Sequence, residues 1–428
     1  MKALLLLRFF VYIVNENYDN KGFFIMQKAA QYQAVLELLA EIFKDKFPAD
    51  NIINAYMRER KYIGSKDRRF VTETVWKIIR NRRKLTFDAG SDDVRKILMT
   101  YLQDEDLDLI FGNGEYAPAA LSKEEKNWLK HKNEEVYPAD VEAECPKWLF
   151  EKIKDMALLK SLNEPATADL RINAGCRGDV IDKLRGEGLF FAPTVYSPIG
   201  IRSTERVNLN NCIAYKEGLI EVQDEASQLA AVLSDVKPEH KVIDYCCGAG
   251  GKTLTISFLM QGKGKIYIHD INKNRLEAIK ERAERLNVKN IETVSGVRDD
   301  DYYDRFIVDA PCSGTGTWRR SPDAKFRLTP EKLRELNQAQ AEILETAYAH
   351  TKSGGRIVYI TCSILREENE EIIEAFKSRH RDMKHFNLKN LWQSKLDAPY
   401  PCVNENYLRF SPLTTGTDGF FFTVLVKE

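Results

Sequence analysis

Two of the eight cysteines stand where a reactive group is expected. Cys312 follows the apolar run RFIVDAP, and Cys362 follows the apolar run RIVYIT. An apolar run that opens into small residues and glycine predicts a buried strand leaving a sheet into a loop. The carboxyl ends of strands in a doubly wound sheet share one crevice, so we expect both thiols to face the same site. Each cysteine alone could equally be a small buried hydrophobic residue.

A glycine-rich turn lies earlier in the chain, in the sequence VIDYCCGAGGKT. Gly248, Gly250 and Gly251 would let the backbone turn tightly and approach a ligand closely. Asp270 ends the next predicted strand, at an offset where an acid commonly binds ribose hydroxyls. The turn has neither P-loop spacing nor a complete G-x-G-x-x-G, which favours an adenosine-type ligand such as S-adenosylmethionine. A glycine turn beside a surface aspartate is the simpler alternative.

A thiol beside such a site suggests methylation of a pyrimidine ring. Carbon 5 of the ring is a poor nucleophile, but a thiolate that adds to carbon 6 makes carbon 5 able to take a methyl group. This chemistry needs a deprotonated thiol, whose ordinary pKa is about 8.5, and a donor near the ring nitrogen. Asp309, close to Cys312 in the sequence, is a candidate for that donor. The base must also be unpaired or flipped out of its helix.

The chain resembles the RsmB/Sun-type RNA cytosine-5 methyltransferases, and most of all the bacterial 16S rRNA enzyme with an N-terminal NusB-like domain. The resemblance rests on DAPCSGTGTWRRSPDAKFR, TCSILREENE, VQDEASQL and the glycine turn with Lys252. PKWL and LRIN resemble the RNA-recognising module of that enzyme, and SKDRRFVTETVWKIIRNRRKL resembles its helical domain.

The resemblance implies roles that the residues alone leave open. It implies that Cys362 is the nucleophile, that Cys312 helps to release the product, and that Lys252 and Asp309 orient the base. It also implies S-adenosylmethionine as the cofactor and an RNA substrate, with rRNA ahead of tRNA. The implied cofactor contacts are Cys246, Cys247, Gly248, Ala249, Gly250, Gly251, Lys252, Asp270 and Asp309.

The chain departs from the family pattern at two places. A proline is common in the family where Ala249 stands. The family aspartate that contacts the adenine aligns near Val297, and Asp299 or a backbone group is the candidate replacement.

Alternating strand and helix patterns over residues 223–428 predict an α/β, doubly wound Rossmann-like methyltransferase domain. The very apolar segment FFFTVLV near the end suits an inserted antiparallel strand. Residues 136–222 are expected to form a small α+β RNA-recognition module, with strands over residues 169–173, 188–198 and 218–224. Residues 27–135 show helical spacing and are expected to form an all-α RNA-binding domain.

One helix of that all-α domain is rich in basic residues. Residues 61–85 hold nine Lys and Arg but only Asp67 and Glu73. The helix would place an apolar stripe inward and a basic face outward, with RNA contact slightly favoured over a merely solvated face. The candidate contacts are Arg68, Arg69, Arg80, Arg82 and Arg83.

Composition narrows the class of protein further. Hydrophobic residues make up 43% of the 428 residues and charged residues 30%, as in a soluble globular chain. The formal net charge is zero, so nucleic-acid binding must use local patches. The cysteines are dispersed without a C-x-x-C pair, and there are only six histidines, so we expect no metal site and a reducing, cytoplasmic setting. We expect a monomer by default.

The N-terminal run ALLLLRFFVYIV is too short to span a membrane and is interrupted by Arg8. We therefore expect residues 1–26 to be an extension, with Met26 as an alternative start, and no membrane association.

Two other functions compete with RNA cytosine methylation. A methyltransferase acting on a protein or a small molecule would leave the paired thiols and the basic helix unexplained. A non-catalytic RNA-binding or ribosome-assembly factor would not need Cys312, Cys362 and Asp309 intact. Methyl transfer to RNA, and the sensitivity of the labelled product to RNase, would separate the three.

Overall fold

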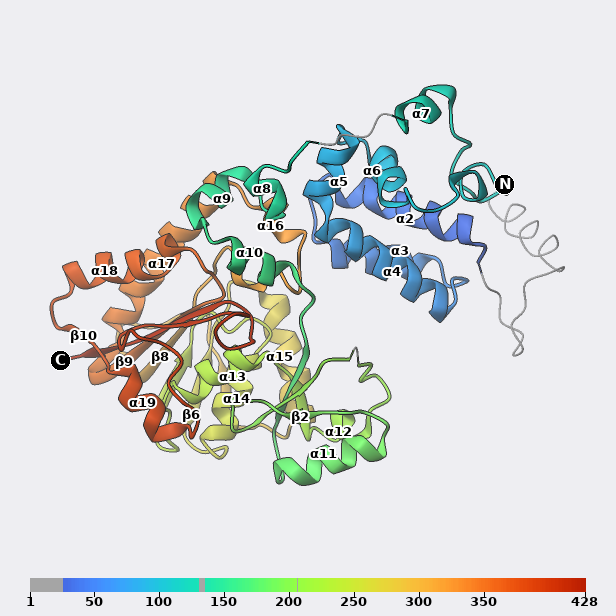
Figure 1. Cartoon of the computed structure of the whole chain (residues 1–428). Helices are drawn as coiled ribbons and strands as arrows, with labels where there is room; N and C mark the ends of the chain where they lie inside the picture. The colour runs from blue at the N-terminus through green and yellow to red at the C-terminus, as the bar shows by residue number, and fades with distance from the viewer. Residues whose placement is uncertain (1–25, 131–134, 206) are drawn as a thin grey trace. The chain divides into compact units, whose positions relative to one another are not determined.

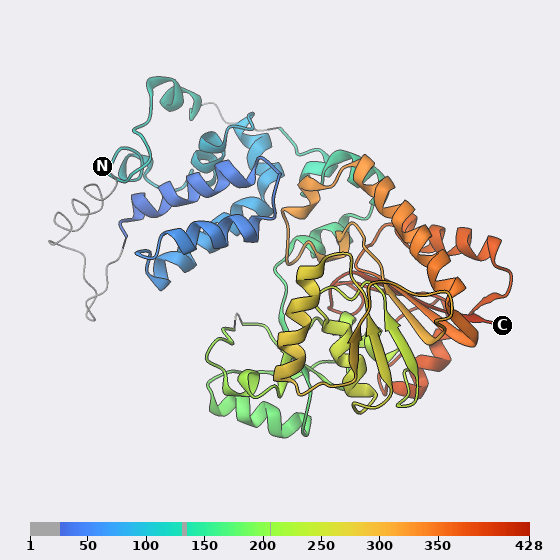
Figure 2. The same cartoon turned by 180° about the vertical axis from the view of Figure 1, so that it is seen from behind.

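The computed structural model describes residues 26–130, 135–205 and 207–428, so the extension expected before Met26 lies outside the described residues. The chain divides into two compact units (Figures 1 and 2). The first, here called the helical unit, runs to Glu151 and also includes Ser321–Arg327. The second, here called the sheet unit, comprises Lys152–Arg320 and Leu328–Glu428.

The helical unit is built from amphipathic helices around one core. Val35, Leu38 and Leu39 of α2 and Val75 and Ile78 of α4 recur at helical spacing and are fully buried together, which holds these helices side by side. The helices are α2 (Lys28–Ile42), α3 (Ala49–Glu59), α4 (Ser65–Arg80), α5 (Arg82–Ala89), α6 (Val94–Tyr101), η1 (Leu107–Leu109), α7 (Lys123–Trp128), α8 (Ala139–Glu142), α9 (Lys147–Ile153) and α16 (Ala324–Arg327).

The helical unit extends beyond the boundary expected at residue 135. The carboxylate of the buried Glu144 accepts hydrogen bonds from the backbone N–H groups of Arg83 and Lys84, at 2.8 and 3.0 Å. Asp323, from the distant segment Ser321–Arg327, accepts the backbone N–H of Ala49 at the start of α3 at 3.0 Å. These contacts join a later part of the chain to the helical unit, which local sequence patterns do not reveal.

A four-stranded antiparallel sheet forms the first part of the sheet unit, in the order β2-β3-β1-β4. The prediction of a strand over residues 188–198 is wrong: only the two-residue β2 (Ala192–Pro193) forms there. It pairs with β3 (Gly200–Ser203), which in turn pairs with β1. Prolines in the expected segment cannot donate to a ladder. The remaining elements are α10 (Met156–Asn163), β1 (Ala168–Ile172), α11 (Arg177–Gly186), α12 (Ile213–Lys216) and β4 (Ile220–Val222).

The main sheet has the order β10-β12-β9-β8-β5-β6-β7, with β11 paired to β12. Strands β7, β6, β5, β8 and β9 are parallel, and β12 runs antiparallel to β9, as expected from its late apolar sequence. The strands are β5 (Lys241–Asp244), β6 (Lys265–Ile268), β7 (Ile291–Thr293), β8 (Tyr303–Asp309), β9 (Thr351–Thr361), β10 (Met383–His385), β11 (Leu408–Phe410) and β12 (Phe420–Lys427).

Alternate residues along each central strand enter two separate cores, which is why helices cover both faces of this sheet. Val242 and Ile307 pack with α13, α14, α15 and α19, whereas Ile243 and Phe306 pack with α17 and α18. The covering helices are α13 (Glu225–Val232), α14 (Gly251–Leu259), α15 (Lys273–Arg285), α17 (Pro330–Ala349), α18 (Glu370–Arg379) and α19 (Leu388–Lys395), with short turns η2 (Thr315–Thr317) and η3 (Arg366–Glu368).

Strands β5, β6 and β7 follow one another toward one edge of the sheet, and the chain then returns to form β8 on the other side of β5. The strand order therefore changes direction between the neighbouring parallel strands β5 and β8. Ligands in doubly wound sheets bind outside the carboxyl ends of the strands at such a switch point. The expected doubly wound fold is confirmed, and it brings the glycine-rich turn after β5 close to the loops after β8 and β9. Among the helices of the described residues, none is long and apolar enough to cross a lipid bilayer.

Candidate active site

The two candidate thiols lie in contact. Cys312 follows β8 and Cys362 follows β9, and these neighbouring parallel strands place the two sulfur atoms 3.3 Å apart. Both side chains are only partly buried. The sequence therefore located both thiols correctly at strand ends, and the register of β8 against β9 brings them together.

Backbone hydrogen bonds hold the thiol loops in place. The N–H of Gly316 donates to the carbonyl of Cys362 at 2.9 Å, and the N–H of Gly419, just before β12, donates to the carbonyl of Gly316 at 2.8 Å. A Cβ atom on Gly316 would lie 1.9 Å from the carbonyl oxygen of Gly419. Only glycine fits between these loops, because any side chain would force them apart.

A buried lysine faces the same site. The ammonium nitrogen of Lys252, at the start of α14, lies 2.8 Å from the carboxylate of Asp309 at the end of β8. Burial by itself would lower the pKa of Lys252, but the charge and hydrogen bond of Asp309, and then the charge of Cys362, raise that pKa above its ordinary value. Lys252 therefore carries a positive charge close to Cys362.

The environment of Cys312 favours its protonated form. The hydrogen bond with Cys362, burial, and the negative charges of Cys362 and Glu368 together raise the pKa of the Cys312 thiol well above its ordinary value. The two thiols thus differ electrostatically: Cys312 lies near a carboxylate, and Cys362 lies near an ammonium group.

The glycine-rich turn forms a backbone cradle at the end of β5. Gly250 has a φ of 80° and is the N-cap of α14, a left-handed conformation that favours glycine. The carboxylate of Asp270, after β6, accepts a hydrogen bond from the backbone N–H of Gly248 at 2.9 Å. The backbone N–H of Cys247 donates to the backbone carbonyl of His269 at 3.0 Å. Ala249 is exposed at the tip of the turn, and Gly251 begins the helix.

The other two cysteines of the turn are poorly suited to reaction. Burial raises the pKa of the thiols of both Cys246 and Cys247 well above the ordinary value, and nearby carboxylates add to the effect. These thiols stay protonated and contribute to the shape of the cradle rather than to nucleophilic chemistry.

The residues of the cradle fit S-adenosylmethionine. Asp270 can accept hydrogen bonds from ribose hydroxyls, and the exposed backbone of the turn can approach the ligand closely. Asp244, at the end of β5, is 1% exposed, and its Oδ1 atom has no hydrogen-bond partner among the described residues. An orphaned buried acceptor of this kind is expected at a site that a polar ligand completes. Val297 is half-buried, and Asp299 is exposed.

Sequence reasoning missed the groups that support the thiols. Glu368, Gln340, Ser313 and Ser363 form a buried hydrogen-bond cluster directly behind Cys312 and Cys362. The segment LREENE holds three acidic residues, and nothing in its local pattern tells which one is buried. Within the described ranges, no group of three His, Cys, Asp or Glu side chains is arranged to hold a metal ion.

Most of the arginines expected to contact RNA are used inside the helical unit. Arg82 pairs with Asp45 at 2.8 Å and stacks on the rings of Phe43 and Phe326, and Arg83 pairs with Asp140. Arg68 donates to the carbonyls of Ile63 and Arg60, at 2.8 and 2.9 Å, and Arg69 pairs with Glu73 at 2.8 Å. Arg80 is half-buried and also has an interaction partner. The predicted basic face is therefore not a row of unpaired charges.

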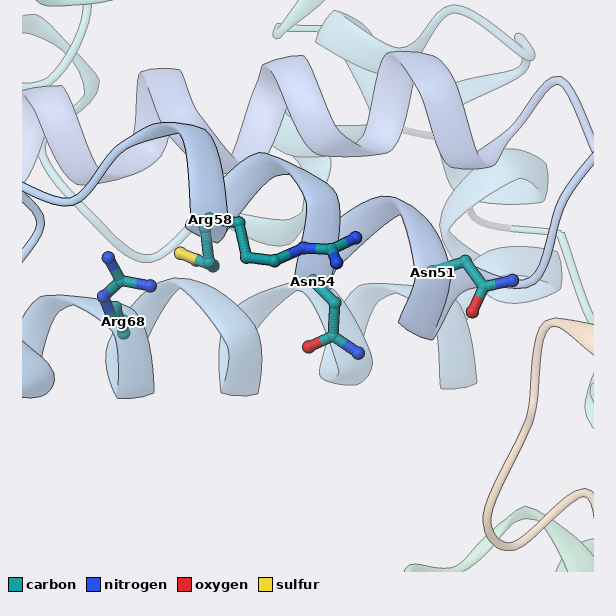
Figure 3. Close-up of a pocket in the computed structure, with 5 residues that line it drawn as sticks. Asn51, Asn54, Arg58 and Arg68 are labelled. Atoms are coloured by element: carbon teal, nitrogen blue, oxygen red, sulfur yellow. The ribbon is translucent and has the colours of Figure 1, made fainter. Parts of the chain in front are cut away.

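An open pocket of about 500 Å³ lies between α3 and α4 (Figure 3). Asn51, Asn54 and Arg58 line it from α3, with Arg68 from α4 and the buried Met57 also contributing. Arg58 is exposed and makes no ion pair within the part of the chain that the structure describes. The pocket thus offers amide and guanidinium donors without a lining carboxylate, which suits an anionic ligand.

Comparison with known proteins identifies relatives of both the sequence and the fold. A family model described as 16S rRNA methyltransferase RsmB/F matches residues 230–426. The chain is 31% identical, over 308 residues and 67% of each chain, to the probable ribosomal RNA small subunit methyltransferase B of Bacillus subtilis (strain 168).

Solved structures extend the likeness to the fold. The chain in "Crystal Structure of PH0851" is 23% identical with a TM-score of 0.75, and the match covers 94% of this chain and 100% of that one. The structure of NSun6 from Pyrococcus horikoshii with SFG is 21% identical with a TM-score of 0.58, covering 66% of this chain and 98% of that one. The family match thus confirms the expectation drawn from the cysteine motifs and the glycine turn: this chain belongs to the RsmB/F family of S-adenosylmethionine-dependent RNA methyltransferases.

Proposed function

We propose that this protein transfers a methyl group from S-adenosylmethionine to carbon 5 of a cytosine in RNA, and that 16S rRNA is its substrate. The observation that supports the chemistry is the contact of two thiols, 3.3 Å apart, beside the Lys252–Asp309 pair. Methyl transfer to a nucleophile that is already reactive needs no thiol pair, whereas carbon 5 of cytosine needs covalent activation. The names of the rRNA methyltransferase relatives support the choice of RNA.

The first half of the reaction belongs to Cys362. Its thiolate, next to the Lys252 ammonium, bonds to carbon 6 of the flipped-out cytosine, and the electron pair of the carbon 5–carbon 6 bond moves toward the ring nitrogen and carbonyl. In this proposal Asp309 and Lys252, which are paired at 2.8 Å, orient the ring, and the Lys252 ammonium stabilises this negative charge. S-adenosylmethionine, when bound, would supply an electrophilic methyl group: carbon 5 bonds to it, the methyl–sulfur bond breaks, and S-adenosylhomocysteine is the leaving group.

The second half of the reaction needs Cys312. A base removes the proton from carbon 5, and the carbon 6–sulfur bond breaks, so that Cys362 leaves as a thiolate. Cys312, whose pKa is raised, still carries its proton and can donate an S–H hydrogen bond to the departing sulfur. Release of the methylated RNA therefore depends on Cys312, whereas attack does not.

The helical unit is proposed to contact RNA at the pocket between α3 and α4. Arg58 and the side-chain amides of Asn51 and Asn54 face this pocket, and the guanidinium of Arg68 is held rigid there by two backbone carbonyls. Phosphate oxygens accept hydrogen bonds from these groups, and contacts of this kind position RNA without reading its sequence. The NusB-like character of the helical domain remains a prediction.

The cysteine roles can be tested with purified protein, tritiated S-adenosylmethionine, and rRNA or tRNA from a strain that lacks the gene. We expect label in rRNA with the wild type, no label with Cys362→Ala, and a covalent RNA adduct on an SDS gel with Cys312→Ala. Cys176→Ala, at an exposed position outside the site, is the matched control and should behave as the wild type.

Other outcomes would change the proposal in defined ways. Label in tRNA but not rRNA would replace the substrate and keep the chemistry. Full methylation by both cysteine variants would show that the thiols are structural. Absence of label in any RNA would favour a non-catalytic RNA-binding role in ribosome assembly.

The RNA contact can be tested separately by measuring RNA affinity over a range of salt concentrations. Arg58→Ala should weaken RNA binding. It should also reduce the slope of the logarithm of the binding constant against the logarithm of salt concentration by about one, as expected for a lost phosphate contact. Lys280→Ala removes an exposed charge from α15 and is the control. Identical affinities and slopes for Arg58→Ala and the wild type would place the RNA elsewhere.

A further inference from the structure

One buried carboxylate links the two thiol loops. Glu368, at the end of η3, is 0% exposed. It accepts hydrogen bonds from the backbone N–H of Ser313 at 2.8 Å, the hydroxyl of Ser313 at 2.5 Å and the hydroxyl of Ser363 at 2.5 Å. Ser313 directly follows Cys312, and Ser363 directly follows Cys362. A single side chain thus binds the residue next to each thiol.

Neighbouring groups complete the cluster. Gln340 of α17 donates to both the Glu368 carboxylate, at 3.0 Å, and the carbonyl of Pro311, at 2.9 Å. The hydroxyls of Thr315 and Ser363 lie 3.0 Å apart, and Thr315 also accepts the N–H of Ile364 at 3.0 Å. The thiol loops are therefore joined through side chains as well as through their backbones.

The burial of the Glu368 carboxylate costs folding free energy. Within the described residues, no Lys, Arg or His lies close enough to form an ion pair with it, so a fully buried carboxylate is held by hydrogen bonds alone. Burying a carboxylate without a cation is strongly unfavourable, and a neutral side chain could hold two loops together at lower cost. A negative charge at this place therefore suggests a role in the reaction.

We propose that Glu368 is a positioning residue, whose carboxylate binds the loops of Cys312 and Cys362 so that the two sulfur atoms stay in contact during release of the methylated RNA. This inference rests on the proposed function of the two thiols. Glu368 itself is buried and touches neither thiol in any hydrogen bond of the described residues, so it acts through Ser313 and Ser363.

The charge of Glu368 adds to its effect on geometry. It is one of the causes that raise the pKa of Cys312, after the hydrogen bond with Cys362, burial and the charge of Cys362. A carboxylate at this point helps to keep a proton on Cys312, and that proton is what the departing sulfur needs. Loss of Glu368 should therefore harm release more than attack.

The test uses the full-length protein with Glu368→Gln, which keeps the shape of the side chain but removes its charge. Multiple-turnover methylation should fall by as much as about 100-fold, the effect of a displacement near 1 Å in a catalytic group. The single-turnover rate of methyl transfer should change much less, and the covalent RNA adduct should accumulate. Glu368→Asp, which keeps the charge, should recover part of the multiple-turnover rate.

A readout without RNA tests the geometry directly. Diamide oxidises two adjacent thiols to a disulfide and is itself reduced to a hydrazine. Because the sulfur atoms lie 3.3 Å apart, the wild type should form the Cys312–Cys362 disulfide rapidly, and Glu368→Gln should form it several-fold more slowly. Mass spectrometry of peptides identifies the bond. This readout remains valid even if the RNA substrate or the methylation chemistry has been assigned wrongly.

Controls separate positioning from loss of folding. Glu367→Gln changes the neighbouring glutamate, which pairs with Lys152 at the surface, and should match the wild type in every assay. Ser363→Ala, which removes one hydrogen-bond donor from the cluster, is the second variant for the case that Glu368→Gln does not fold. It should show part of the same loss of multiple-turnover rate and of disulfide formation. Equal disulfide rates for wild type, Glu368→Gln and Ser363→Ala, or equal losses of single-turnover and multiple-turnover rates, would overturn the proposal.

Discussion

At the scale of single residues, the ligand cradle concentrates charge that the fold must stabilise. Asp244, Asp270 and Asp309 end three adjacent strands or follow them directly, and Lys252 is the buried cation among them. Carboxylates so close together cannot all be equally acidic, because like charges and burial both disfavour ionisation. The site should therefore respond to pH and to substitution in ways specific to each carboxylate.

Asp244 should make the stability of the ligand-free protein depend on pH. Burial raises its pKa to about 7, with a further contribution from Asp309, while the hydrogen bond from Thr253 opposes the shift. Because the folded pKa lies above the unfolded value of 3.8, this group stabilises the fold below about pH 4 and loses that contribution as pH rises through about 7. The free energy of unfolding of Asp244→Asn, relative to that of the wild type, should therefore increase as the pH rises from 5 to 8.

Thermal unfolding at a series of pH values checks this expectation. The difference in stability between variant and wild type should change by about 1–3 kcal/mol over that range. Asp182→Asn, an exposed variant that loses a pair with Arg185, is the control. Parallel pH profiles for Asp244→Asn and the wild type would contradict the raised pKa.

Asp270 should govern cofactor affinity. Its carboxylate accepts the N–H of Gly248 at 2.9 Å and that of Asn272 at 2.8 Å, and it is the acid placed to bind ribose hydroxyls. Asp270→Ala should raise the Kd of S-adenosylhomocysteine by about 10- to 100-fold, since hydrogen bonds to a charged group contribute about 1.5–3 kcal/mol. Isothermal titration calorimetry measures the Kd, with Glu277→Ala on the exposed side of α15 as the control. An unchanged Kd would remove Asp270 from the cofactor site.

At the scale of secondary-structure elements, three loops determine where the thiols lie. The loops after β8 and β9 and the turn before β12 are joined at Gly316 and Gly419, where backbone contacts leave no room for a side chain. Because β12 is inserted antiparallel beside β9, its preceding turn reaches the carboxyl ends of the parallel strands. The inserted strand therefore helps to build the site.

Gly316→Ala should disrupt this junction. The new Cβ atom would lie 1.9 Å from the carbonyl oxygen of Gly419, and overpacking of this kind costs about 1–3 kcal/mol. We expect a lower thermal midpoint and a strong loss of methylation, because the thiols would be displaced. Gly296→Ala adds a Cβ atom into open space and is the matched control. Wild-type stability and activity in Gly316→Ala would show that the loops can separate freely.

At the scale of the whole molecule, the chain crosses from the sheet unit into the helical unit and back. Ser321–Arg327 follows the Cys312 loop in sequence but packs within the helical unit. There Lys325 is 1% exposed, and burial lowers its pKa to about 8 while the charge of Glu144 opposes the shift. The helical unit is therefore completed by residues that lie far along the chain.

Removal of Lys325 should destabilise the helical unit. Lys325→Met would leave the buried Glu144 carboxylate without this partner, at a cost of about 3 kcal/mol, whereas Lys325→Met with Glu144→Gln should recover much of the loss. Urea unfolding followed by far-ultraviolet circular dichroism measures the change, and Lys44→Met at an exposed site is the control. Equal destabilisation by the single and the double variant would show that the two charges are not coupled.

Short-range patterns in the sequence determined much of this protein. Apolar runs predicted β5, β6, β8 and β9, helical spacing predicted α2 and α4, and the positions of Cys312 and Cys362 after two such runs predicted a shared site. These predictions succeed because a strand or a helix depends mainly on residues within a few positions of one another, and because parallel strands align their carboxyl ends.

Tertiary structure alone decided which side chains meet. Arg82 and Arg83 looked like an RNA-binding face, yet Asp45 and Asp140 pair with them. Glu368 looked like any other acid in LREENE, yet it is the one buried behind both thiols. In each case the partners come from different segments of the chain, so the environment of a charge depends on how distant elements pack and not on the residues beside it in the sequence.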